Sequence, residues 1–227
     1  MRCHLIRRVL SCAAFGVFGL FGQAQADVID FESLPPDSLF LSGDTFTQNL
    51  YYRFTQQGNF GAVSTAAGFA VALPPTGNDT QFYGALNDSS LAVRRSDGIP
   101  FSISGFDAAY LAPVPQDEGT IAGRIFLVGT DTLGHTLFNT WEFGAAAADG
   151  SFAFQTYSTG FSLFNNLTSA FFAACIYGQD GACSNPFENS AQFALDNLII
   201  AVPEPSTYGL LALGLLSVGL YSRRARR

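Results

Sequence analysis

The 227-residue sequence contains no lysine, one methionine, one tryptophan and two histidines. Without lysine, a Schiff-base enzyme has no amine nucleophile. The chain also lacks a His-Glu-x-x-His zinc motif, a Gly-x-Ser-x-Gly elbow and a glycine loop that could hold phosphate. His135, the histidine of the central region, follows Gly134 as a solvated turn residue would. These absences exclude zinc proteases, α/β-hydrolases and nucleotide enzymes.

Positive charge is scarce in the middle of the chain and concentrated at its two ends. Residues 27–202 hold four arginines against seventeen acidic residues, so their net charge is −13, compared with −7 for the whole chain. Such a field repels nucleic acids and anionic lipids. We therefore expect no nucleic-acid partner.

The N-terminus has the order of a secretory signal. A head containing three arginines precedes an uncharged, largely apolar run at 9–22, and the small residues Ala24 and Ala26 follow it. This order predicts a signal peptide at 1–26, which signal peptidase removes by cleavage before Asp27.

The C-terminus combines three features in a fixed order. An apolar stretch at 208–221 precedes four arginines at 223–227, and it follows a short motif of Val202, Pro203, Glu204, Pro205 and Ser206. Fourteen helical residues span about 21 Å, against about 30 Å of membrane hydrocarbon. The stretch therefore predicts a short transmembrane helix, with its arginines on the cytoplasmic side and residues 27–202 outside.

These three features, at 202–227, closely resemble the PEP-CTERM sorting signal, which is also catalogued as the ice-binding protein C-terminal domain. The resemblance implies processing by an exosortase, a membrane protease-transferase, in a Gram-negative bacterium that makes exopolysaccharide. It also implies a transient inner-membrane anchor, followed by delivery to the cell surface or extracellular matrix. We expect no ice binding, because the chain has no regular Thr-x-Thr array.

Removal of the signal leaves one pair of cysteines, Cys175 and Cys183. In an oxidising compartment, two cysteines eight positions apart predict a disulfide-closed loop. A metal site is the alternative, but His135 is the other soft ligand of this region and a single histidine does not complete one.

The central region, 27–201, is predicted to be an all-β domain. Short apolar and β-branched segments alternate with turn signals such as Ser96-Asp97-Gly98, and no helix is convincing. The expected strands are Val28–Leu34, Phe69–Leu73, Phe101–Leu111, Gly123–Thr130, Thr136–Phe143, Phe152–Tyr157, Ala170–Tyr177 and Gln192–Ala201. Their number and spacing favour an antiparallel β-sandwich. The apolar run at 125–128 predicts a central strand that is covered on both faces.

Segments 29–32, 105–111 and 192–198 resemble many PEP-CTERM proteins of unknown activity. This second resemblance implies a lectin-like or carbohydrate-module-like jelly roll.

Three acidic residues are candidates for a calcium site. Asp30 and Glu32 are two positions apart, so that in a strand they share a face, and Asp196 lies in the closing apolar run. The first and last strands of a sandwich are commonly neighbours, and calcium prefers oxygen ligands. The alternative is that Asp30 and Glu32 face water and Asp196 ends a strand.

Two function classes remain open. The first is a non-enzymatic adhesive or polysaccharide-associated protein, in which Trp141 either stacks on a sugar ring or fills the core. The second is a carbohydrate-active enzyme that uses two carboxylates, although the sequence singles out no pair among its acidic residues.

The sorting motif generates the first testable prediction. Glu204→Ala removes one charge from a proline-stiffened segment, so that we expect export to be intact and release by the exosortase to be blocked. In an exosortase-containing host, fractionation should find the variant at the inner membrane with its C-terminal arginines, while the native protein moves outward without them. Equal release of both proteins would contradict the prediction.

Overall fold

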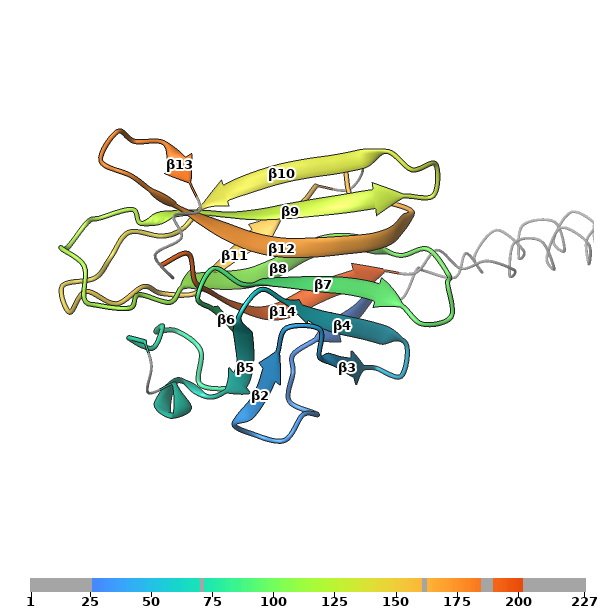
Figure 1. Cartoon of the computed structure of the whole chain (residues 1–227), viewed down its shortest axis with the longest axis horizontal. Helices are drawn as coiled ribbons and strands as arrows, with labels where there is room; N and C mark the ends of the chain where they lie inside the picture. Colours follow the sequence, from blue (N-terminus) through green and yellow to red (C-terminus); the bar gives the residue numbers. More distant parts are fainter. Residues whose placement is uncertain (1–25, 70–71, 161–162, 185–189, 202–227) are drawn as a thin grey trace, which may run out of the picture. The chain divides into compact units, whose positions relative to one another are not determined.

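Two seven-stranded antiparallel sheets make up the part of the chain that the computed structural model describes, which is residues 26–69, 72–160, 163–184 and 190–201 (Figure 1). Sheet 1 has the order β11-β8-β14-β6-β5-β2, with β1 also paired to β14. Its strands are β1 (Ala26–Ile29), β2 (Ser38–Leu41), β5 (Phe60–Ser64), β6 (Phe82–Leu86), β8 (Ser102–Tyr110), β11 (Gln155–Ser158) and β14 (Phe193–Ala201).

Sheet 2 has the order β10-β9-β12-β7-β4-β3, with β13 also paired to β12. Its strands are β3 (Thr45–Gln48), β4 (Tyr52–Gln57), β7 (Ser90–Arg95), β9 (Gly123–Asp131), β10 (Thr136–Glu142), β12 (Leu167–Tyr177) and β13 (Cys183–Ser184). The predicted all-β antiparallel sandwich is confirmed. None of the described helices is long and apolar enough to cross a membrane, and the expected signal and tail helices lie outside the described residues.

The main core lies between the two sheets and is rich in aromatic rings. Phe106 of β8 contacts both Trp141 of β10 and Phe172 of β12, with 5.1 Å between ring centroids in each case. Phe46 of β3 stacks on Phe54 of β4 at 5.2 Å. Because strand side chains alternate between faces, these rings turn inward and their neighbours in the sequence turn outward.

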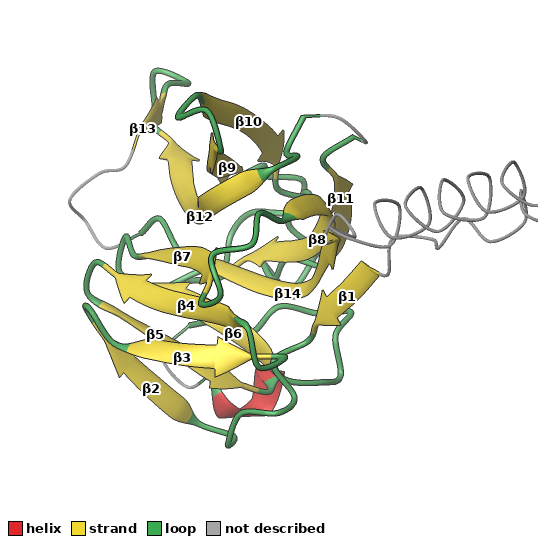
Figure 2. Cartoon of the chain, turned by 90° about the vertical axis from the view of Figure 1, so that its right-hand side faces the viewer, coloured by secondary structure: helices red, strands yellow, loops and turns green. Residues whose placement is uncertain are grey.

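A second, smaller core covers the outer face of sheet 1. The short 3-10 helix η1 (Ala66–Gly68), red in Figure 2, leads into Phe69, which stacks on Phe82 of β6 at 4.8 Å. Gly84 of β6 makes room for this ring, because a Cβ atom there would lie 2.5 Å from the ring of Phe69. Ala66, Phe69, Ala72 and Phe154 therefore form a cover over the central strands of this sheet.

Strand β14 changes its neighbour part-way along its length. Phe193–Leu195 pair with β6, whereas Leu198–Ala201 pair with β1 on the same edge. A bulge separates the two ladders, and in it Asn197 takes the left-handed conformation with φ of 46°. The expected contact between the first and last strands is thus present.

The structure corrects several predicted strands. Five of the expected segments between Phe101 and Ala201 correspond to β8, β9, β10, β12 and β14. In contrast, β1 ends at Ile29, because Phe31 has φ of 59° and cannot continue a strand. The described residues of the expected strand Phe69–Leu73 do not form one: Phe69 belongs to the cover of sheet 1, Leu73 makes an isolated bridge to Ala112, and residues 70 and 71 lie outside the described part of the chain.

The predicted disulfide is present. Cys175 of β12 and Cys183 of β13 are joined with their Cα atoms 5.4 Å apart, and the bond closes the loop between these two strands. Residues from Ala26 to Pro203 form one compact unit that contains both cores and this bond. Because the unit closes its own cores, it can be produced by itself.

The disulfide should contribute measurably to stability. Replacing both cysteines with alanine should lower the free energy of unfolding by about 2.5 kcal/mol, because the bond limits the entropy of a short loop in the unfolded chain. Urea denaturation of residues 26–203 checks this, and the reduced native protein serves as the control. A double variant as stable as the oxidised native protein would contradict it.

Candidate functional site

The outer face of sheet 2 is the candidate binding face. In β4 the side chains of Tyr52, Phe54 and Gln56 are buried, whereas Arg53 and Thr55 are half-buried and lie on the opposite face. The same alternation runs through the other strands of the sheet. The outward set comprises Thr45, Thr47, Arg53, Thr55, Gln57, Ser90, Ala92, Arg94, Ser169, Phe171, Arg124, Phe126, Val128, Thr130, Thr136, Phe138, Thr140 and Glu142.

Three phenylalanines form a strip across this face. The ring of Phe126 in β9 lies 6.1 Å from that of Phe138 in β10 and 6.4 Å from that of Phe171 in β12. Phe138 is 59% exposed, although it is a large apolar residue. The expectation that the strand at 125–128 is covered on both faces was therefore wrong, because Phe126 and Val128 are partly exposed on the outer face.

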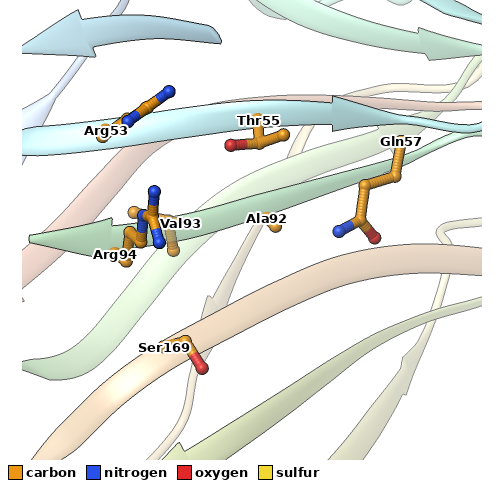
Figure 3. A pocket seen from close by; sticks show the side chains of 7 residues that line it. All are labelled: Arg53, Thr55, Gln57, Ala92, Val93, Arg94 and Ser169. Atoms are coloured by element: carbon orange, nitrogen blue, oxygen red, sulfur yellow. The ribbon is translucent and has the colours of Figure 1, made fainter. Parts of the chain in front are cut away.

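Next to the aromatic strip is a shallow hollow of about 290 Å³. β4, β7 and β12 line it with Arg53, Thr55, Gln57, Ala92, Val93, Arg94 and Ser169 (Figure 3). Ala92, a small residue, lies directly opposite Phe171 in the neighbouring strand, so that the hollow and the strip are adjacent. The surface thus offers an aromatic platform beside guanidinium, hydroxyl and amide groups, which together suit a polar ligand with flat apolar faces.

Arg124 and Glu142 form an ion pair on the outer face of sheet 2, at the end away from the hollow. The guanidinium of Arg124 lies 3.1 Å from the carboxylate of Glu142, to which Tyr177 also donates a hydrogen bond at 2.7 Å. The hydrogen bonds from Tyr177 and Arg124 hold the pKa of Glu142 below its usual range. This carboxylate is therefore already satisfied within the protein.

The three acidic residues predicted from the sequence lie near the bulge of β14, on sheet 1. Asp30 and Glu32 are exposed, and Oε1 of Glu32 accepts the backbone N–H of Gln81 at 2.6 Å. Asp196 is completely buried. Asn78 and the backbone of Asn197 donate hydrogen bonds of 2.6 Å and 2.8 Å to its two carboxylate oxygens.

No described histidine, cysteine, aspartate or glutamate belongs to a group of three or more that could hold a metal ion. Asp30, Glu32 and Asp196 thus lie in one region of the fold without forming such a group. The calcium site stays a prediction that the described side chains do not support.

Asp196 is instead one of a pair of opposed carboxylates. Its register partner in β8 is Asp107, whose carboxylate accepts a hydrogen bond from the Asn197 side chain at 2.8 Å. Burial is the main cause that raises the pKa of Asp196 to about 7, and the charges of Asp107 and Asp30 contribute to this rise, while the hydrogen bonds from Asn197 and Asn78 oppose it. A carboxyl with such a pKa suits acid catalysis, but this one has no exposed surface for a substrate to touch.

Trp141 lies on the inner side of sheet 2. Its ring meets Phe106 edge-on and lies 6.3 Å from Tyr157, and the side chain is half-buried against the main core. Of the two alternatives for Trp141, this position favours core filling, and the described aromatic platform consists of phenylalanines that the sequence did not single out. His135 is in the β9–β10 turn, where its ring nitrogen Nδ1 lies 2.9 Å from Asp131.

The C-terminal segment matches a known family model. The model of the PEP-CTERM protein-sorting motif covers residues 201–227. The chain carries this sorting motif. It marks the protein as exported and as an exosortase substrate directed toward the cell surface, while the motif residues Val202 to Ser206 themselves lie outside the described residues.

The domain resembles solved structures in its fold alone. A DUF4465 family protein from Bacteroides caccae is 11% identical, with a TM-score of 0.56, over 79% of this chain and 100% of that one. A family 29 carbohydrate-binding module is 13% identical, with a TM-score of 0.35, over 78% of this chain and 91% of that one. No curated protein matches the sequence significantly.

The buried carboxyl of Asp196 predicts an unusual pH dependence. Its folded-state pKa of about 7 exceeds the ordinary value of 3.8, so that the folded protein binds the extra proton between these values. The free energy of unfolding should therefore fall as pH rises from 4 to 7, by up to about 1.4 kcal/mol per pH unit from this group.

Asp196→Asn provides the comparison, because the amide does not titrate. Urea denaturation at several pH values should give a native-minus-variant difference that decreases from pH 4 to pH 7 and is flat above pH 8. Parallel curves for the two proteins would contradict the assignment.

Proposed function

We propose that this domain is a non-enzymatic, polysaccharide-associated module of the bacterial surface or extracellular matrix. The observation that carries the proposal is the outer face of sheet 2, where the strip of Phe138, Phe126 and Phe171 borders the polar hollow. Pyranose rings present flat C–H faces that pack on aromatic rings, and their hydroxyls bond to polar side chains at the margin.

The contrast between the two outer faces supports this assignment. Ala66, Phe69, Ala72 and Phe154 cover the central strands of sheet 1 and leave Leu39 and Leu41 exposed on its edge strand β2, whereas on sheet 2 the central residues Phe126 and Phe171 are partly exposed and Phe138 is 59% exposed. A side chain as large and apolar as Phe138 contributes less to folding at such a position than it would in the core. Its exposure is understandable if it contacts a ligand.

The runner-up function, a carbohydrate-active enzyme, receives less support. Its best candidate acid, Asp196, is fully buried and hydrogen-bonded to Asn78, away from the hollow of sheet 2. The sorting motif supports a location of the proposed module outside the cell. The Glu204→Ala experiment tests whether a membrane-anchored intermediate precedes this location.

Replacing Phe138 with alanine should weaken polysaccharide binding by about three- to tenfold, because it removes an aromatic contact without opening the core. Affinity electrophoresis of residues 26–203 in gels containing dextran, agarose or polygalacturonate measures this. Leu41→Ala is the matched control, since Leu41 is 58% exposed and lies on β2 of sheet 1.

The proposal requires that the native protein binds a polysaccharide. The native protein must be retarded by at least one polysaccharide of the panel or by exopolysaccharide from an exosortase-containing bacterium. Absence of retardation in every gel, with the protein folded by circular dichroism, would overturn the proposed function.

A further inference from the structure

The outer face of sheet 2 differs in charge from the rest of the domain. Three of the four arginines within residues 27–202 lie on it, namely Arg53, Arg94 and Arg124. The outward side chains of this sheet include one carboxylate, Glu142, which pairs with Arg124. An excess of two positive charges therefore remains on one face of a domain whose net charge is −13.

Arg53 and Arg94 carry this excess charge, and their arrangement is unfavourable for the stability of the sheet. They are register partners on the adjacent strands β4 and β7, so that two guanidinium groups project from directly opposed positions. Like charges in such positions destabilise a sheet. A stabilising role in the fold does not account for this pair.

Neither arginine is neutralised by a described carboxylate. Arg95 pairs with Asp97 and Arg124 with Glu142, whereas the hydrogen bond recorded for Arg53 goes to the hydroxyl of Thr45 at 3.3 Å. Arg94 is exposed and forms no described ion pair. The two guanidinium groups can therefore bind an external anion without first breaking an internal salt bridge.

Their surroundings complete a binding site. Both arginines line the 290 Å³ hollow beside the hydroxyls of Thr55 and Ser169 and the amide of Gln57 (Figure 3). Four strand spacings separate Arg53 on β4 from Phe138 on β10, which is about 19 Å. An extended chain of several sugars can thus rest on the phenylalanines and reach the arginines.

We propose that Arg53 and Arg94 bind the carboxylate or sulfate groups of an acidic polysaccharide that lies across the outer face of sheet 2. This inference rests on the proposed function and specifies its ligand class. Guanidinium groups bind such oxyanions through paired, charge-assisted hydrogen bonds. The acidic remainder of the domain repels a polyanion, so that binding is restricted to this face.

The test uses Arg53→Gln and Arg94→Gln, singly and together, in residues 26–203. Affinity electrophoresis in polygalacturonate supplies carboxylates, dextran sulfate supplies sulfates, and dextran is the neutral reference. Each single variant should weaken binding to the preferred acidic polymer about tenfold and leave any binding to dextran unchanged. Binding by the native protein should also weaken as salt is raised.

Two controls separate a binding site from a general effect of charge. Leu41→Glu lowers the net charge of the domain by the same one unit, but at an exposed position of β2 on sheet 1, and should retain acidic-polymer binding within about twofold. Urea denaturation should find the Arg53 and Arg94 variants at least as stable as the native protein, because like-charge repulsion is relieved.

The outcomes distinguish failure of this inference from failure of the proposed function. Dextran or agarose binding without acidic-polymer binding, or equal binding by the arginine variants, would overturn the anion site and leave the polysaccharide role intact. Equal retardation by single-stranded DNA and polygalacturonate would also overturn it. Absence of binding to any polysaccharide would overturn both.

Discussion

Strand β14 has β8 along one edge, and on its other edge it changes partner from β6 to β1, a change that organises sheet 1. On that second edge neither β6 nor β1 pairs with Asp196 and Asn197, so that the ladder is interrupted there. Asn78 fills the gap by donating to the Asp196 carboxylate, and Asn197 reaches Asp107 on β8. A buried acid is thus accommodated where the ladder is interrupted, because its carboxylate accepts the backbone N–H of Asn197, which a regular ladder would have paired.

This arrangement separates structural acids from the binding face. The acids near the bulge serve loop and strand contacts on sheet 1, which also carries a second core. The inner face of sheet 2 packs in the main core between the sheets. Its outer face displays aromatic and basic side chains. The two faces differ because Ala66, Phe69, Ala72 and Phe154 cover the central strands of one of them.

The sequence was most informative where the strands are long and apolar. Strands β8, β9, β10, β12 and β14 were all located, because their length makes the apolar pattern visible. The strands β2 to β7 were missed: they are short, and β3 and β4 bury glutamines, Gln48 and Gln56, where a regular alternation would have an apolar residue. The segment at Phe69 was predicted to be a strand because it is apolar. Phe69 is apolar for another reason, which is that its ring packs on the outer face of sheet 1.

The candidate site was harder to anticipate than the fold. The pairing of Arg53 with Arg94 depends on the register of β4 and β7, which are distant in the sequence and have an irregular connection. Similarly, Phe126 and Phe171 meet only after β9 pairs with β12. A sequence pattern can assign each of these residues to a face, but tertiary pairing decides which face is covered.

The position of β14 in sheet 1 also constrains the timing of folding during export. It contacts β8, β6 and β1, so that the first strand of the domain has no partner until the last one has been synthesised and translocated. β2, β5 and β6 can pair with one another as the chain emerges, whereas β1 waits unpaired, and β6 and β8 are joined into one sheet only when β14 enters between them. For this architecture, exit of the C-terminal strand from the secretion channel is the event that permits completion of the fold.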